Sequence, residues 1–124
     1  MGFLDFLKRK PMPRPREQDW QVSVGDLAIV VQDQNGDTQS VTKDRLSGVM
    51  IETNDSGPWG VDFWWILLDD KSELACAFPQ GATGEKDAIK YLMQLEEFNL
   101  DALGNAMRST NNQAFVVWTK PTPQ

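Results

Sequence analysis

Apolar and polar positions alternate in short runs through the first two thirds of the chain. The runs are rich in β-branched and aromatic residues and are separated by turn-forming residues, a pattern typical of antiparallel strands. The sequence Asp33-Gln34-Asn35-Gly36-Asp37 contains the Asn-Gly signal of a hairpin, and Asp69-Asp70-Lys71-Ser72 predicts another turn. We therefore predict an antiparallel meander of about five strands, over residues 27–32, 38–42, 46–53, 61–68 and 73–78.

The hydrophobic period changes after Pro79-Gln80-Gly81-Ala82. Thr83 is the predicted N-cap of a helix, and apolar residues then recur at helical spacing. Asn99 is the predicted cap of a second helix, and residues 114–119 are a predicted final strand. In the first helix Ala88, Ile89, Leu92 and Met93 recur at this helical spacing, and from the second helix we expect Leu100, Leu103 and Met107 to face inward.

These elements predict an α+β fold, in which two C-terminal helices cover a strongly bent antiparallel sheet. A partly open barrel, similar to the pleckstrin-homology-like or Sm-like small barrels, is an alternative. We expect three parts: a basic N-terminal segment with a proline-rich linker over residues 1–20, a single α+β domain over 21–119, and a disordered tail over 120–124.

The most distinctive stretch is the turn and strand of residues 53–68. Both faces of the predicted strand are apolar, because Phe63, Trp65 and Leu67 alternate with Trp64, Ile66 and Leu68. Such a strand is buried on both sides, by a second layer or by another subunit. Tryptophan is enriched at protein interfaces. Our candidates for an interaction surface are Asp55, Trp59, Asp62 and Trp64; the other interpretation is that both tryptophans belong to the core and that Asp55 bonds its own turn.

The charge distribution is uneven. The net charge is −6, but residues 1–16 carry five basic groups and one acidic group, which gives +4, and residues 17–124 carry 7 basic and 17 acidic groups, which gives −10. An acidic body repels phosphate backbones, so we expect no nucleic-acid partner. A basic protein partner fits this charge, and solubility alone is the other explanation.

The residue types exclude several chemistries. The chain has no histidine, so it cannot assemble a Ser-His-Asp triad, and its one cysteine, Cys76, cannot form an intramolecular disulfide or a multi-cysteine zinc site. We expect Cys76 to be a buried, unreactive thiol, and we expect no cofactor, no metal and no enzymatic activity. Two weaker alternatives are an acid–base or cation-binding pair of Asp55 and Asp62, and a phosphate cradle at Gly81-Ala82-Thr83-Gly84. For the glycine-rich stretch we favour a plain strand-to-helix connection.

The N-terminal segment combines apolar and basic residues before a series of prolines. Such a segment can contact an anionic membrane surface or a partner, although a tail that packs on its own domain is the alternative. The docking candidates are Phe3, Leu4, Phe6, Leu7, Lys8, Arg9 and Lys10. The sequence contains no apolar run of membrane-spanning length and no signal-peptide pattern, so we expect a cytoplasmic protein, with attachment at the inner face of the membrane as the alternative.

Several strings resemble a family of small bacterial proteins without an established activity. The resemblance covers roughly residues 24–119 and rests on Thr53-x-Asp55-x-Gly57-Pro58, Asp62-Phe63-Trp64, Pro79-Gln80-Gly81-Ala82, Ala106-Met107-x-Ser109-Thr110-x-Asn112 and Phe115-x-x-Trp118. An Sm-like barrel would imply RNA binding, and a pleckstrin-homology-like barrel would imply phosphoinositide binding. The acidic charge of residues 17–124 disfavours both ligands.

We expect the chain to act as a non-enzymatic protein-interaction module, most simply as a homodimer. Two alternatives remain: an immunity or antitoxin-like protein that binds a basic partner, and a peripheral membrane protein attached through residues 1–16.

Overall fold

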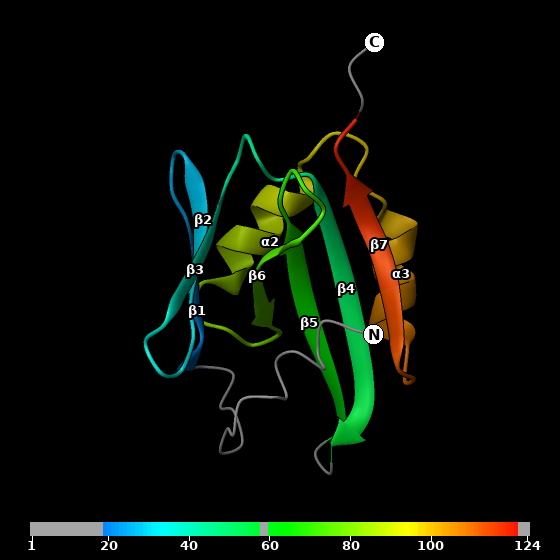
Figure 1. The fold of residues 1–124 in the computed structure, drawn as a ribbon. Helices are drawn as coiled ribbons and strands as arrows, with labels where there is room; N and C mark the ends of the chain where they lie inside the picture. Colours follow the sequence, from blue (N-terminus) through cyan, green and yellow to red (C-terminus); the bar gives the residue numbers. More distant parts are fainter. Residues whose placement is uncertain (1–18, 58–59, 122–124) are drawn as a thin grey trace.

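The computed structural model describes residues 19–57 and 60–121, and of residues 55–57 and 60–62 it describes the backbone alone. This part of the chain forms seven strands and two helices (Figure 1). In chain order they are β1 (Gln21–Val24), β2 (Ala28–Gln32), β3 (Thr38–Thr42), β4 (Gly48–Gly57), β5 (Gly60–Leu68), β6 (Leu74–Pro79), α2 (Glu85–Met93), α3 (Leu100–Arg108) and β7 (Gln113–Thr119).

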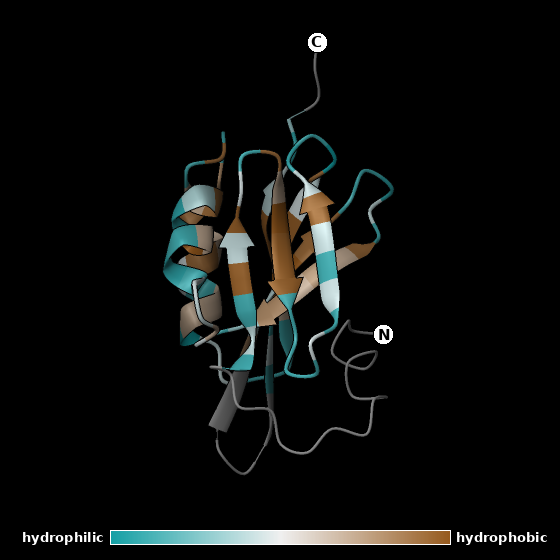
Figure 2. Cartoon of the chain, turned by 90° about the vertical axis from the view of Figure 1, so that its left-hand side faces the viewer, coloured by the Kyte–Doolittle hydropathy of each residue, from teal (hydrophilic) through white to brown (hydrophobic). Residues whose placement is uncertain are grey.

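Strands β1, β2 and β3 form a three-stranded antiparallel sheet. The predicted hairpin joins β2 to β3: the Asp33 carboxylate accepts hydrogen bonds from the backbone N–H groups of Asn35 and Asp37, and Gly36 takes the positive φ that the turn requires. Ile29, Val31 and Val41 are buried, whereas the residues that alternate with them are more exposed. The sheet therefore has one core face and one solvent face, and its apolar central strand β2 is visible in Figure 2.

The second sheet is antiparallel and has the order β6-β5-β4-β7. Strand β4 pairs with β5 as far as Gly57 and Gly60, whereas β7 pairs with β4 only up to Thr53 and β6 pairs with β5 only from Trp64 onward. Residues 54–57 and 60–63 thus extend beyond both neighbouring strands as a two-stranded arm.

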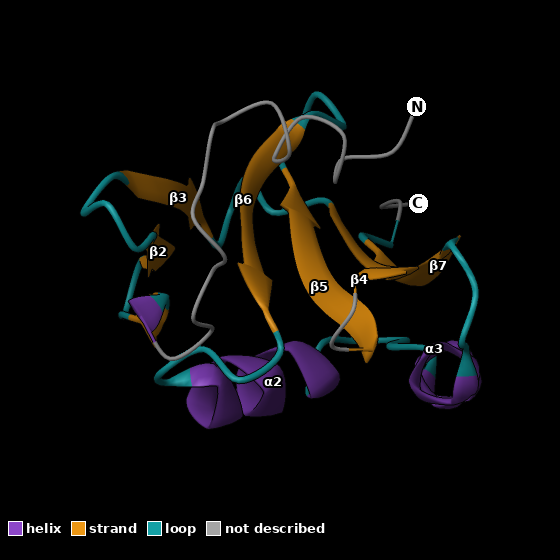
Figure 3. Ribbon diagram, turned by 90° about the horizontal axis from the view of Figure 1, so that it is seen from below, coloured by secondary structure: helices purple, strands orange, loops and turns teal. Residues whose placement is uncertain are grey.

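Both helices lie on the same side of the four-stranded sheet, and the three-stranded sheet stands beside β6 (Figure 3). The two sheets meet through a side chain, because Gln39 in β3 accepts a hydrogen bond from the backbone N–H of Ala77 in β6. The predicted α+β class is confirmed: the antiparallel strands form two sheets, which remain open. Sequence reasoning did not separate β1 as a strand, and Trp20, which it assigned to the segment of residues 1–20, is buried.

Strand β5 is the centre of the core. Trp64, Trp65, Ile66 and Leu67 are all buried, which confirms that the strand is covered on both faces. On one face Trp65 stacks on Phe78, with ring centroids 6.2 Å apart and an interplanar angle of 9°. On the other face Trp64 meets Trp20 edge-on at 5.1 Å.

The helices differ in two respects from the predictions. The predicted N-cap Thr83 is not the cap of α2: Gly84 occupies that position in a left-handed conformation, and Thr83 instead forms a parallel bridge with Gln21. In α3, Asn99 is the cap as predicted and accepts from the N–H of Ala102. Leu103 is buried, but Leu100 and Met107 are 59% and 64% exposed, because α3 faces the sheet through Leu103 and Ala106.

Gly84 provides a direct test of how α2 is joined to β1. Its φ is +87°, and a Cβ atom there would collide with the carbonyl oxygen of Val22. Gly36 has a similar φ of +89°, but a Cβ atom there would only come into ordinary contact, at 3.9 Å, with the end of the Gln32 side chain. We expect Gly36→Ala to cost about 1–2 kcal/mol, the usual cost of a left-handed alanine. Gly84→Ala should cost at least about 1 kcal/mol more, because steric overlap is added to the same strain. Chemical denaturation of both variants measures the difference, and equal costs would contradict this arrangement.

Two buried tryptophans form a second matched pair. The indole N–H of Trp118 donates to the carbonyl oxygen of Glu96 at 2.7 Å, whereas that of Trp20 has no partner in the described part of the chain. Replacement by phenylalanine removes similar volume at both sites, but only Trp118→Phe loses a hydrogen bond. We expect its free energy of unfolding to fall by about 1 kcal/mol more than that of Trp20→Phe. Urea titrations of the two variants will show whether this order is correct.

Candidate functional site

Of the four residues predicted to form an interaction surface, Trp64 has a defined environment. It is 7% exposed and packs against Trp20, so it belongs to the core and not to an exposed patch. The prediction that named it as a surface candidate is wrong, and the alternative that assigned it to the core is correct. The physical reason is that Trp20, which precedes β1, covers this face of β5.

Two of the other three candidates belong to strands of the two-stranded arm. Asp55 belongs to β4 and Asp62 to β5, where Asp62 is in register with Asn54, but their side chains lie outside the described residues. Trp59 falls outside the described residues altogether. Within the described chain, His, Cys, Asp and Glu side chains form no group of three or more that could hold a metal ion.

The docking candidates of the N-terminal segment, Phe3, Leu4, Phe6, Leu7, Lys8, Arg9 and Lys10, also fall outside the described residues. The two described helices are both too short to cross a membrane.

The glycine-rich connection before α2 is structural. Three of its four backbone N–H groups already have partners within the protein: that of Gly81 donates to the Glu85 carboxylate at 2.8 Å, that of Ala82 to the Pro79 carbonyl and that of Thr83 to the Trp20 carbonyl. No set of free N–H groups converges there on a phosphate, so we discard the phosphate-cradle alternative in favour of the plain connection.

Cys76 lies in β6 and is fully buried. Burial away from water disfavours the thiolate and raises the pKa of this thiol from 9.0 to about 12. A thiol that stays protonated at neutral pH is a poor nucleophile, in agreement with the expected unreactive role.

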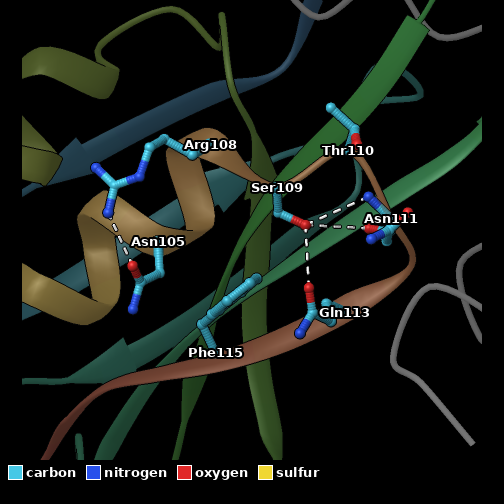
Figure 4. Close-up of a pocket in the computed structure, with 7 residues that line it drawn as sticks. All are labelled: Asn105, Arg108, Ser109, Thr110, Asn111, Gln113 and Phe115. Atoms are coloured by element: carbon cyan, nitrogen blue, oxygen red, sulfur yellow. Dashed lines mark hydrogen bonds between the residues drawn. The ribbon is translucent and has the colours of Figure 1, made fainter.

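A polar pocket lies between the end of α3 and the start of β7 (Figure 4), and sequence reasoning did not identify it. Its volume is about 370 Å³, within the range of small-molecule sites. The helix and the loop that follows it provide most of the lining, and β7 provides the rest. The lining residues are Asn105, Arg108, Ser109, Thr110, Asn111, Gln113 and Phe115.

The loop that lines this pocket is tied to the sheet by one buried hydroxyl. Thr53 in β4 is 2% exposed, and its Oγ1 donates to the carbonyl oxygen of Asn111 at 2.7 Å and lies 3.1 Å from Ser109 Oγ. Ser109 in turn bonds the side chain of Gln113 at 3.3 Å. The shape of the pocket is therefore set before any ligand arrives.

Strand β7 forms one edge of the four-stranded sheet. In the part of the chain that the structure describes, it pairs with β4 along one side and with no strand along the other. On that outer side the carbonyl of Val117 accepts from the N–H of Asn99 at 2.7 Å. Val116 is 52% exposed, and the seven residues of β7 include neither a charge nor a proline.

Comparisons with protein-family models, with curated proteins and with solved structures return no match. The resemblance to a family of small bacterial proteins stays a prediction that rests on the strings themselves. The pocket lining includes residues of two of those strings, Ser109 and Thr110 from one and Phe115 from the other.

The burial of Cys76 has a measurable consequence at high pH. The unfolded chain releases the thiol proton above about pH 9, whereas the folded chain keeps it until about pH 12. The contribution of this group to stability is therefore complete below pH 9 and is lost as the pH rises, by about 1.4 kcal/mol per pH unit. Relative to Cys76→Ala, we expect the free energy of unfolding of the natural chain to fall by about 2 kcal/mol more between pH 8 and pH 10.5. Urea titrations at the two pH values give this difference, and parallel pH profiles would contradict it.

Proposed function

We propose that this protein is a protein-interaction module that forms a homodimer by pairing strand β7 with β7 of a second copy. The observation that supports this proposal is the character of the edge strand. Edge strands of monomeric proteins usually carry lysine, proline or a bulge that points the edge away. The residues of β7 are Gln113-Ala114-Phe115-Val116-Val117-Trp118-Thr119, without charge or proline, and the one irregularity in the pairing with β4 lies between Val116 and Trp118, opposite Val49 and Met50.

A second copy is a suitable occupant for this edge. Two identical strands that pair antiparallel across a twofold axis bring no like charges together along Gln113–Thr119, because the strand carries none. Val116, near the middle of the strand, is an exposed β-branched residue that gains contacts when a neighbouring strand is added. The carbonyl of Val117 is already occupied by the Asn99 N–H, so the backbone hydrogen bonds of the added strand would come from the rest of the outer edge.

This surface differs from the one suggested by the sequence. Trp64 is in the core, and the arm that carries Asp55 and Asp62 lies at the other end of β4 from Gly48. The homodimer proposal itself is unchanged, but β7 replaces the tryptophan patch as its contact.

The test is a charge placed on the edge. We expect the full chain to migrate as a species of twice 14.0 kDa in light scattering coupled to size exclusion. Val116→Lys should shift it to the monomer, because two lysines would face each other across the axis. Leu27→Lys is the matched control: Leu27 is 80% exposed and lies outside β7, so the same change there should leave the dimer intact. A monomeric natural chain, or a dimer that survives Val116→Lys, would overturn the proposal.

A second candidate, an immunity-like protein that binds a basic partner, is favoured by the charge of −10 on residues 17–124. The two candidates respond differently to salt. Added salt weakens the binding of a basic protein because it screens the charges, whereas pairing of the uncharged β7 strands is insensitive to salt or slightly strengthened.

A further inference from the structure

We propose that the pocket between α3 and β7 binds a small organic monocarboxylate, with Arg108 as the residue that recognises the negative charge. The inference concerns a ligand site and does not use the dimer in its argument, although Gln113 and Phe115 of the lining belong to β7. It rests on the polar groups that remain available in the pocket after its internal hydrogen bonds have formed.

The hydrogen bonds within the pocket use the acceptor oxygens of its amide side chains and leave N–H donors available to a ligand. Asn105 Oδ1 accepts from Arg108 at 2.8 Å, and Gln113 Oε1 accepts from Ser109 Oγ at 3.3 Å (Figure 4). The carbonyl oxygen of Asn111 is taken by the Thr53 hydroxyl at 2.7 Å. The side-chain N–H groups of Asn105 and Gln113 have no partner in the described chain, and the Arg108 guanidinium, which carries five N–H donors, uses one bond to Asn105. The side-chain amides and the guanidinium of the pocket therefore offer donors, which suit a ligand that brings acceptors.

The charge of the pocket favours an anion. Within the described residues no acidic side chain lies within ion-pair distance of Arg108, in contrast to Arg45, which pairs with Asp69 and Asp70. The lining includes no Asp or Glu. The neighbouring amide of Asn105 positions the guanidinium without neutralising it, and a guanidinium binds a carboxylate through two parallel hydrogen bonds.

The same surroundings limit the ligand to one negative charge. Arg108 is the only cation of the lining, and it lies in the last turn of α3, where the free carbonyl oxygens carry partial negative charge. A phosphate dianion would bring a second charge toward those oxygens. The half-buried Phe115 ring offers an apolar surface for the body of the ligand, and a pocket of about 370 Å³ accommodates a small ring with its carboxylate.

Benzoate is a suitable probe, with benzamide as its neutral counterpart and phenyl phosphate as the dianion. In nitrogen-15 NMR spectra of the full chain, we expect benzoate to shift the signals of Arg108, Gln113 and the loop between them, with a Kd on the order of 1 mM. Benzamide should bind at least about tenfold more weakly, which corresponds to the loss of one charge-assisted interaction. Phenyl phosphate should bind no better than benzoate.

Arg108→Gln should weaken benzoate at least about tenfold and abolish its advantage over benzamide. Lys86→Gln is the matched control, since it removes the same charge from α2, outside the pocket, and should leave benzoate binding unchanged. The spectrum of Arg108→Gln itself reports whether the variant is folded. Absence of saturable shifts at the pocket, equal binding of benzoate to Arg108→Gln, or tighter binding of phenyl phosphate would each overturn the proposal.

Discussion

Burial of strand β5 on both faces is the constraint on which the rest of the structure depends. Trp64, Trp65, Ile66 and Leu67 are consecutive buried residues, so the sheet must be covered on both sides along β5. Phe78 and the helical layer are on the Trp65 side, and Trp20 covers the Trp64 side. In a domain of this size these large aromatic side chains account for much of the apolar surface removed from water, and the other elements are arranged around them.

The order of the elements was predictable because it depends on local signals. The Asp33–Asp37 turn, the Asp69–Ser72 turn and the Asn99 cap are each formed by residues that bond their own neighbouring backbone, so the sequence alone identifies them. The apolar β5 was equally clear from its composition. The class of the fold followed from these elements together.

What escaped prediction depends on contacts between distant parts of the chain. Gly84 caps α2 because Thr83 is bonded to residues near the N-terminus, and no local pattern shows this. Leu100 and Met107 fit a helical period, but the sheet meets α3 through Leu103 and Ala106 instead. The pocket was missed for the same reason: Ser109-Thr110-Asn111-Asn112 has the composition of an ordinary loop, and only the Thr53 hydroxyl, more than fifty residues earlier, gives it a fixed shape.

The connection between Thr83 and the first strand also has a consequence for the order of events during synthesis. The N–H of Val22 donates to the Thr83 carbonyl, and the N–H of Thr83 donates to the carbonyl of Trp20. The β1-β2-β3 hairpins are local and can form early, but their attachment to the remainder of the domain must wait until the connection before α2 has left the ribosome. Until then the apolar side chains of Val22, Ile29 and Val31 lack their final neighbours. A nascent chain that stalls before residue 83 therefore exposes this apolar face to chaperones and to other chains.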